Sequence, residues 1–393
     1  MKENRVDTSN KKRFVTIFPN IENIHLMKDV GMYPFAMYSY CGYDSGVVVN
    51  KRLDYPYLSS EVRGLKKFNA PSIFSNHEVN CILWLLFNAR KIDVLNLFHQ
   101  VKHTRISIAL YKRLNKKGKV YVHLDCDGTE YENYQLGLEG NSIKRRVKRF
   151  IYYHIFYPKR IRKDVFWGVQ NKLAVKNIVG KFPYEKVKYM PNGYYSKYNR
   201  KVEFADKENI ILTVGRIGTQ QKRTDLLIQG FIEASPYIEK SWRLEIVGPI
   251  ENHFESQIKK IYMKNPELQD RIIFTGAVYN RVELAEKYRR AKLFTLTSDY
   301  ESFGIVLVEA MSQGCTLLTS NFPASYDLID NEKNGKVFSI GNIKEFVDKL
   351  IDIANDDNYM EECCLNGQQF ARENYDYLNI AKRLDKWIYN LEE

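Results

Sequence analysis

The chain has 393 residues, a formal net charge of +13 and a hydrophobic share of 44%. This length exceeds what one core usually supports, so we expect two domains, and the composition excludes a disordered chain. No apolar run reaches the ~18 residues of a membrane span, and the polar start, MKENRVDTSNKKRF, lacks the apolar core of a secretion signal. We therefore expect a cytoplasmic protein with a negatively charged partner.

Short β-branched stretches alternate with helix-length amphipathic stretches along the chain, which predicts βαβ units and parallel sheets. In the first half the predicted strands are 13–18, 45–50, 93–98, 119–124, 164–170 and 186–191. In the second half they are 209–215, 243–248, 271–276, 293–298, 315–320 and 335–339. Two such runs predict an α/β protein with two doubly wound, Rossmann-like domains.

A polar stretch after the Asn-Gly turn at 192–193 marks the predicted join. We expect a first domain over 1–195 and a second domain over 196–376. The last residues, 377–393, should form a C-terminal helix that packs back towards the N-terminal domain. The six cysteines show no CxxC pair or metal-ligand spacing, so we expect free thiols.

Loops after strands bind ligands in such sheets, and three of them in the second half carry suitable residues. The first is VGRIGTQQKR, where Gly215 and Gly218 permit a tight backbone and Arg216 and Lys222 supply cations. A solvated basic loop is the alternative for this stretch. The second is FTGAVY, a turn around Val278 that leaves backbone groups free beyond the strand end.

The third stretch is SDYESFGIVLVEAMSQG, which places Glu301 and Glu309 eight positions apart around an apolar run. A helix that begins near Ser302 or Phe303 would be apolar on every side, so it belongs in a protein interior. A buried carboxylate there needs a hydrogen-bonded partner. That partner is either a ligand hydroxyl, such as a ribose diol, or a core Arg or Lys.

The motifs VGRIGTQQKRTDLLI, FTGAV and ESFGIVLVE followed by AMSQG resemble those of retaining glycosyltransferases of family 4, which contain the Glu-x7-Glu pattern. The MPNGY turn at 190–194 resembles the end of their first domain. The resemblance covers about 190–340. It implies the GT-B fold, with two Rossmann-like domains facing across a cleft, and sugar transfer from a nucleotide diphosphate without a metal or other cofactor. In that fold 1–195 would be the N-terminal acceptor-side domain and 196–376 the nucleotide-sugar-binding domain.

The resemblance also implies roles for individual residues. Arg216 and Lys222 match the cations that stabilise the leaving diphosphate, Glu309 matches the ribose-binding glutamate, and Glu301 matches the glutamate that contacts the donor sugar. The predicted donor-binding positions also include Ser302, Phe303, Gly304, Gly215 and Val278.

The first domain departs from the family pattern. The loop after its first strand, FPNIENIHLMKD, contains no glycine where many relatives have a glycine-rich loop. The residue that would contact the donor sugar is His99, His123 or Asp125, and we take Asp125 because it directly follows a predicted strand. The DCDG stretch at 125–128 has the Asp-x-Asp spacing of metal-binding transferases, but such short spacing arises often by chance, so no metal is expected.

The segment 142–163 is strongly basic and interleaved with aromatic residues. One interpretation is an interfacial helix on an anionic membrane surface. The other is an ordinary helix whose aromatic residues lie in the core and whose charges are solvated. Nucleic-acid binding is not expected, because no recognisable module accompanies the charge.

These observations together predict a hexosyltransferase that moves a sugar from a UDP-sugar donor to a glycan or lipid-linked acceptor in cell-surface polysaccharide or glycoconjugate synthesis. We expect it at the inner face of the cell membrane as a peripheral protein. One alternative is a catalytically silent GT-B subunit that binds glycan or supports a partner transferase. A nicotinamide-dependent oxidoreductase is another, but the chain lacks the GxGxxG turn that it would require.

Overall fold

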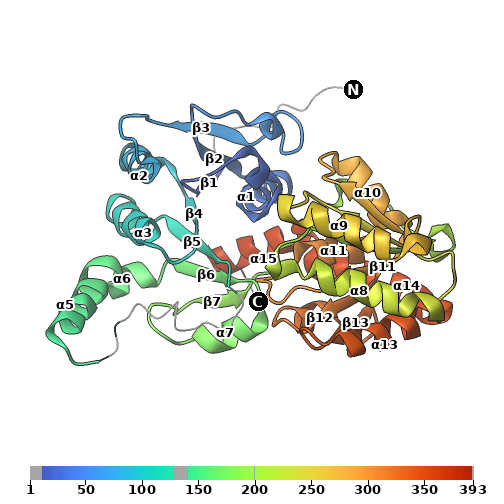
Figure 1. Cartoon of the computed structure of the whole chain (residues 1–393). Coiled ribbons are helices and arrows are strands. Elements are labelled where there is room, and N and C mark those ends of the chain that lie inside the picture. The colour runs from blue at the N-terminus through green and yellow to red at the C-terminus, as the bar shows by residue number, and fades with distance from the viewer. Residues whose placement is uncertain (1–10, 127–137, 139, 199, 392–393) are drawn as a thin grey trace, which may run out of the picture. The chain divides into compact units, whose positions relative to one another are not determined.

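The protein forms two compact units, each with its own parallel sheet (Figure 1). The computed structural model describes residues 11–126, 138, 140–198 and 200–391. Unit 1 comprises Met1–Asn192 and Tyr377–Glu393, and unit 2 comprises Gly193–Asp376. The predicted fold class of two Rossmann-like α/β domains is confirmed.

The sheet of unit 1 has seven parallel strands in the order β3-β2-β1-β4-β5-β6-β7. The strands are β1 (Arg13–Ile17), β2 (Asp44–Asn50), β3 (Lys66–Ala70), β4 (Val94–Phe98), β5 (Lys119–Leu124), β6 (Val165–Val169) and β7 (Val187–Tyr189). Strands β4, β5 and β6 are almost wholly buried, as expected of central strands covered on both faces.

Helices cover both faces of this sheet, with α1 and α15 on one side and α2 and α3 on the other (Figure 1). The helices of unit 1 are α1 (Asp29–Cys41), α2 (His77–Asn88), α3 (Lys102–Leu114), α5 (Ile143–Ile151), α6 (Lys159–Arg162), α7 (Lys172–Ile178) and α15 (Tyr377–Tyr389). The last of these, α15, packs along α1, and Tyr43 donates a hydrogen bond to Asp385 at 2.5 Å.

The sheet of unit 2 has six parallel strands in the order β10-β9-β8-β11-β12-β13. The strands are β8 (Glu208–Val214), β9 (Arg243–Val247), β10 (Ile272–Gly276), β11 (Ala291–Leu296), β12 (Thr316–Ser320) and β13 (Gly335–Phe338). This is the Rossmann strand order, in which the direction of strand addition reverses between the first and fourth strands. The reversal point lies between β8 and β11, and ligands of such sheets bind beyond the strand ends there.

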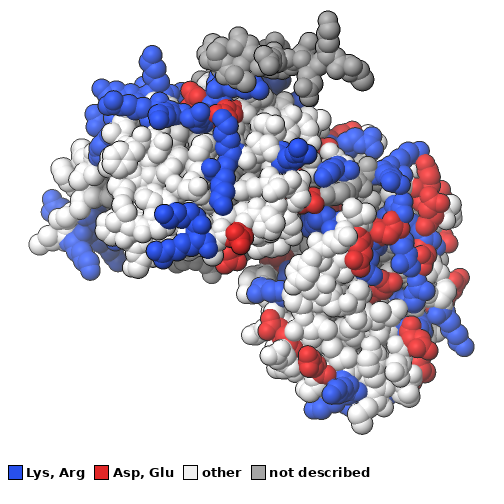
Figure 2. All heavy atoms as spheres, turned by 90° about the horizontal axis from the view of Figure 1, so that it is seen from above, with Lys and Arg blue, Asp and Glu red and all other residues white. Residues whose placement is uncertain are grey.

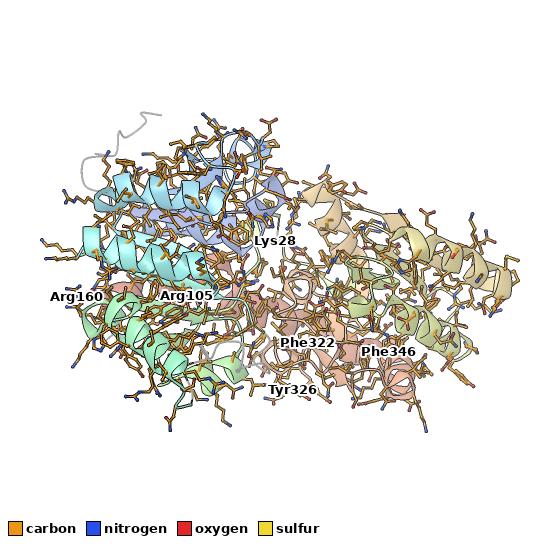
Figure 3. The ribbon with its side chains drawn as sticks, turned by 60° about the vertical axis from the view of Figure 1, so that its left-hand side comes forward. Lys28, Arg105, Arg160, Phe322, Tyr326 and Phe346 are labelled. Atoms are coloured by element: carbon orange, nitrogen blue, oxygen red, sulfur yellow. The ribbon has the colours of Figure 1, made fainter. Side chains whose placement is uncertain are left out.

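The helices of unit 2 pack closely on this sheet. They are α8 (Thr224–Ala234), α9 (Asn252–Lys264), α10 (Arg281–Arg290), α11 (Ile305–Ser312), α12 (Ser325–Leu328), α13 (Ile343–Ala354) and α14 (Asp357–Tyr375). Phe346 of α13, labelled in Figure 3, lies against α8 at Gly230, where a Cβ atom would come within 2.4 Å of the ring. The absence of a side chain at Gly230 is therefore what lets α8 and α13 approach.

A buried lysine ties the carboxyl ends of two helices together in unit 2. The Lys207 ammonium donates to the backbone carbonyls of Arg289 at 3.0 Å, Ala291 at 2.8 Å and Gln313 at 2.8 Å. These carbonyls lie at the end of α10, at the start of β11 and just after α11. Burial lowers the pKa of Lys207, while the carbonyl dipoles at the helix ends favour its positive charge.

We predict that Lys207→Met lowers the free energy of unfolding of unit 2 by roughly 2–4 kcal/mol, because three buried carbonyls lose their donor. Urea unfolding measures the loss. The control is Lys201→Met, since Lys201 pairs with Glu203 at an exposed site where a change should cost less than about 1 kcal/mol. Equal unfolding midpoints for the two variants would contradict the assigned role of Lys207.

Candidate active site

The first predicted loop begins where the carboxyl ends of β8 and β9 approach each other closely. Gly215 directly follows β8, and its N–H donates to Val247 at the end of β9 at 2.9 Å. A Cβ atom at Gly248 would lie 1.7 Å from the carbonyl oxygen of Gly215. The two strand ends therefore approach through backbone alone, and the Lys222 side chain lies beside Gly215, with Cε 3.5 Å from the place of a Cβ atom there.

Arg216 is exposed at the start of the loop after β8. Its guanidinium donates to the Gln221 side-chain oxygen at 3.2 Å, and the Gln221 amide donates to the carbonyl of Tyr300 at 2.9 Å. The Asp299 N–H in turn donates to the Gln221 carbonyl at 2.9 Å. Gln221 thus joins the loop after β8 to the loop after β11 and holds Arg216 beside both.

Lys222 and Glu301 form an ion pair that closes the same two loops, and both side chains are largely shielded from solvent. The Glu301 carboxylate also accepts a hydrogen bond from Ser298 at 2.7 Å. The Thr297 hydroxyl donates to the carbonyls of Lys222 and Arg223, each at 3.0 Å. The structure therefore fixes a cation and a carboxylate together at the carboxyl end of the sheet.

The turn into α11 presents backbone rather than side chains. Gly304 has φ of 89°, a left-handed conformation that favours glycine, and it directly precedes the first helical residue. Phe303 is buried and packs near Tyr375 with ring centroids 6.0 Å apart. Ser302 is half-buried. The N–H groups at the start of α11 have no partner within the helix and carry partial positive charge, which favours an anion there.

The carboxylate of Glu309 has protein partners. Arg281 donates to one of its oxygens at 2.8 Å, and the Tyr288 hydroxyl donates to the other at 3.0 Å. Burial first, and the Glu309 carboxylate second, raise the pKa of Tyr288, so this hydroxyl stays protonated as a donor. These bonds explain how the apolar helix α11 tolerates a glutamate. Each carboxylate oxygen retains a further acceptor position, so hydroxyls of a ligand can still be accommodated.

Val278 lies half-buried in the loop between β10 and α10. The same loop leads to Asn280, whose side chain accepts the N–H groups of Val282 and Glu283 and so caps α10. This cap starts the helix at Arg281 and places Tyr288 two turns further on the same face. Sequence reasoning missed Arg281, Tyr288 and Gln221. The seven-residue spacing of Arg281 and Tyr288 behind a helix cap was the available signal for the first two.

In unit 1 the three candidate sugar-contacting residues lie at the carboxyl ends of neighbouring strands. His99 follows β4, His123 lies near the end of β5, and Asp125 is exposed just beyond it. His123 is fully buried, with Tyr121 at 3.1 Å and Gln170 at 2.8 Å from its two ring nitrogens. Burial first, and then the neighbouring His99, lower the pKa of His123 to about 3, so its ring is neutral at physiological pH.

Asp29, which sequence reasoning did not single out, is the first residue of α1 and lies beside these candidates. Its carboxylate accepts the Val30 N–H at 2.9 Å and lies 3.6 Å from His123 Nε2. Burial first, and then the charge of Asp125, raise the pKa of Asp29 to about 7. The carboxyl edge of the unit 1 sheet therefore holds a carboxyl group that titrates near physiological pH.

The predicted absence of a metal site remains a prediction. Across the residues that the structure describes, no group of three or more His, Cys, Asp or Glu side chains is placed to hold a metal ion. The second aspartate of the DCDG stretch, Asp127, lies outside the described residues.

The raised pKa of Asp29 predicts a pH dependence of stability. Because the folded state binds this proton more tightly than the unfolded chain, the stabilisation by the proton is complete below about pH 4 and is lost as pH rises through about 7. We predict that Asp29→Asn removes this loss of stability, because asparagine does not ionise. At pH 8 the free energy of unfolding of unit 1 should be higher in the variant than in the unmodified protein by roughly 2–4 kcal/mol, at about 1.4 kcal/mol for each unit by which the pKa of Asp29 is raised.

Urea unfolding at pH 5 and pH 8 measures this effect. Asp54→Asn is the control, since Asp54 is exposed and should show the same pH dependence as the unmodified protein. A pH dependence that persists in Asp29→Asn would contradict the assignment.

Comparison with known proteins finds a family to which most of unit 2 is similar. Residues 195–370 match the family described as glycosyl transferases group 1. An uncharacterized glycosyltransferase of Methanocaldococcus jannaschii is 28% identical over 217 residues, which cover 51% of this chain and 53% of that protein. The match thus spans only about half the length of this relative.

Two further proteins extend the similarity into unit 1. A UDP-Gal:alpha-D-GlcNAc-diphosphoundecaprenol alpha-1,3-galactosyltransferase of Escherichia coli is 25% identical over 321 residues, covering 73% of this chain and 78% of that protein. The structure of a sucrose-phosphate synthase from Thermosynechococcus elongatus superposes with a TM-score of 0.67 at 16% identity, covering 97% of this chain and 99% of that one. The chain therefore has the GT-B fold, and its residues 195–370, a little under half of the chain, are similar to the glycosyl transferases group 1 family.

Proposed function

We propose that the protein is a retaining, metal-independent glycosyltransferase of family 4 that transfers a hexosyl group from a UDP-sugar to a glycan or lipid-linked acceptor. The observation that supports it most is the pairing of Lys222 with Glu301 at the reversal point of the unit 2 sheet, beside the start of α11. This arrangement brings a cation, a carboxylate and the N-terminal end of a helix together where such sheets bind nucleotides.

Each group in this site has a chemical role in the proposed reaction. Breaking the bond between sugar and diphosphate builds positive charge on the sugar and negative charge on the departing phosphate. Arg216, Lys222 and the N–H groups at the start of α11 stabilise the second charge. Glu301 faces the sugar, and Glu309 accepts hydrogen bonds from the ribose, as the Glu-x7-Glu pattern of the family implies.

The departing phosphate accepts the proton of the acceptor hydroxyl in the front-face route of retaining enzymes, so this route requires no protein base. The leaving diphosphate is stabilised by fixed cations and backbone dipoles, so no metal is required for it. Asp125 of unit 1 is proposed to contact the donor sugar.

The choice of UDP and of a lipid-linked acceptor rests on similarity. The Escherichia coli relative is named for a UDP-galactose donor and a diphosphoundecaprenol-linked acceptor. We extend both classes to this chain and place it in cell-surface glycan synthesis, at the inner face of the cell membrane. Of the helices that the structure describes, none is long and apolar enough to cross a membrane.

Calorimetric titration of UDP, GDP, ADP and NADH with EDTA present tests donor binding. We predict that UDP binds and that Lys222→Met weakens it roughly 10- to 100-fold, because a charge-assisted hydrogen bond contributes about 1.5–3 kcal/mol. Glu309→Ala should weaken it at least ~5-fold by removing an acceptor of the ribose. Lys240→Met is the control, since Lys240 is exposed on unit 2 away from these loops.

A preference for NADH would contradict the proposal, and so would UDP binding that needs an added divalent metal. Binding of UDP without transfer to any polyprenyl-diphosphate-linked acceptor would instead favour the silent subunit. If transfer occurs, the anomeric configuration of the product, read by NMR, should equal that of the donor sugar.

A further inference from the structure

The net positive charge of the chain lies in unit 1. That unit carries 37 Lys and Arg against 19 Asp and Glu, a net charge of +18, whereas unit 2 carries 23 against 28, a net charge of −5. Figure 2 shows the imbalance on one face of the molecule, where basic side chains predominate over acidic ones on unit 1 and both kinds mix on unit 2. A large anionic surface is therefore attracted mainly to unit 1.

The segment 142–163 is the most basic part of unit 1, with nine Lys and Arg and no Asp or Glu. Within it, helix α5 exposes its apolar side chains: Ile143 is 80% exposed, Val147 53% and Phe150 61%. Their spacing of four and three residues puts them on one face of the helix. A helix of a water-soluble domain normally turns such a stripe towards the core, so this one is arranged for a partner that is apolar as well as anionic.

The opposite side of the segment anchors it to unit 1. After α5 the chain forms a π-helix over Tyr152–Phe156, a distortion that is frequent at functional sites. Tyr152, Tyr157 and Ile161 are buried in the core of unit 1, and the Tyr157 hydroxyl donates to Gln100 at 2.9 Å. The exposed stripe is therefore held outward by core packing on the other side.

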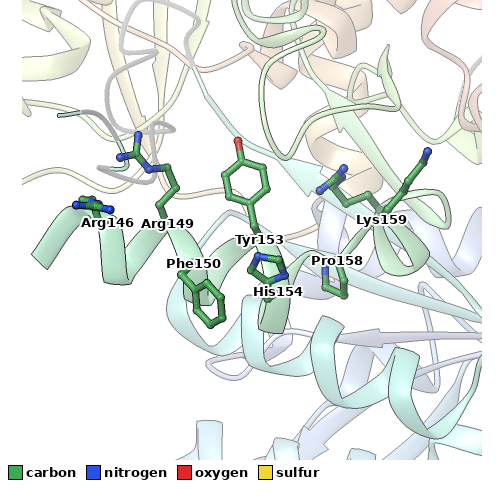
Figure 4. A pocket seen from close by; sticks show the side chains of 8 residues that line it. Arg146, Arg149, Phe150, Tyr153, His154, Pro158 and Lys159 are labelled. Carbon is green, nitrogen blue, oxygen red and sulfur yellow. The ribbon is translucent and has the colours of Figure 1, made fainter. Parts of the chain in front are cut away.

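A pocket of about 660 Å³ opens beside the stripe, between α5 and α6 (Figure 4). It is lined by Arg146, Arg149, Phe150, Tyr153, His154, Pro158, Lys159 and Arg162. Arg149, Tyr153 and Lys159 extend on one side of the ribbon in Figure 4, whereas Phe150 and His154 lie together on the other.

The cations of this pocket differ in their partners. Arg162 pairs with Glu185. No acidic side chain within the described ranges forms an ion pair with Arg146, Arg149 or Lys159, and Arg149 donates only to the carbonyl of Gly140, at 3.3 Å, among the bonds that the structure defines. Three cations around one pocket are thus available to an anion from outside the protein.

We propose that residues 142–163 dock unit 1 on an anionic phospholipid surface, with Ile143, Val147 and Phe150 inserted among the acyl chains and a lipid phosphate bound by Arg146, Arg149 and Lys159. The apolar stripe favours lipid over nucleic acid, which offers no apolar phase for aliphatic side chains. The alternative of an ordinary helix with its aromatic residues in the core fits Tyr152 and Tyr157 but does not account for the exposed Phe150. This inference deepens the location in the proposed function, and its test is independent of donor binding.

Sedimentation with vesicles of phosphatidylglycerol and phosphatidylcholine in equal parts, at about 0.15 M salt, tests the inference. We predict that Arg146→Gln/Arg149→Gln/Lys159→Gln lowers the partition coefficient roughly 100-fold, since each basic residue near an anionic surface contributes about fivefold. The matched control is Lys259→Gln/Lys260→Gln/Lys264→Gln, which removes the same charge from the exposed face of α9 in unit 2. This control should change the partition coefficient by less than about twofold.

The apolar stripe has its own pair of variants. Phe150→Ser should lower partitioning about tenfold or more, because a buried aromatic side chain is lost from the lipid, whereas Met263→Ser, at an exposed position of α9, should not. Circular dichroism and UDP titration of every variant verify that it is folded and separate this test from that of donor binding.

Several results would overturn the inference. Equal losses in the two triple variants would show that charge alone attracts the protein to the surface. Vesicle binding that is unchanged by the substitutions at 146, 149 and 159 would show that the segment is solvent-exposed and does not contact lipid. Binding of inorganic phosphate or single-stranded RNA with the same dependence, but not of vesicles, would assign the pocket to a free anion or to nucleic acid.

Discussion

The ion pair between Lys222 and Glu301 is the interaction on which the candidate site depends. It spans the two loops that follow β8 and β11, the neighbouring strands at which the direction of strand addition reverses. The connections from these strands lead to α8 and α11, and a second ion pair, between Arg223 and Asp299, also joins the two loops. The first pair, with Gln221 and Thr297 on either side of it, fixes both loops before any ligand arrives. Such preorganised charge is more effective for catalysis than charge that must first be assembled.

The carboxylate of Glu309 has a structural role in the protein, and the proposed function gives it a second role as a ligand of the ribose. Arg281 and Tyr288 satisfy it within the protein, which makes it compatible with the apolar helix α11. These two partners come from α10, whose end is held to the end of α11 by the buried ammonium of Lys207. The position of Glu309 thus depends on a lysine at the start of β8 that touches no predicted ligand. Two acceptor positions remain on the carboxylate, and the proposed ribose contact would use them.

Much of the fold could be predicted from the sequence because its central strands are short and rich in β-branched residues. The predicted strands 45–50 and 119–124 correspond to β2 and β5. Strand β3, with the sequence KKFNA, was not predicted. It lies at the edge of the sheet, where exposed lysines replace the apolar pattern. The loops of the site could also be predicted, because each of them follows a strand that is recognisable in the sequence.

The hydrogen-bonding and ion-pair partners of the predicted site residues could not be predicted from the sequence. Gln221, Arg281 and Tyr288 acquire their roles only when separate elements meet in the folded chain. Asp29 shows the same limit, because nothing in its sequence neighbourhood indicates that α1 buries it beside His123. The exposed stripe of α5 was likewise undecidable from sequence, since amphipathic spacing does not say which face a helix turns to the core.

The most direct test of the central claim is hydrogen–deuterium exchange with and without UDP. If the reversal point of unit 2 binds the diphosphate, UDP should slow exchange in two peptides, one covering 215–222 and the other covering 301–309, and the protection should disappear in Lys222→Met. The sheet edge at β12 and β13 should exchange at the same rate in both states. Protection confined to other segments, or equal protection in Lys222→Met, would contradict the account.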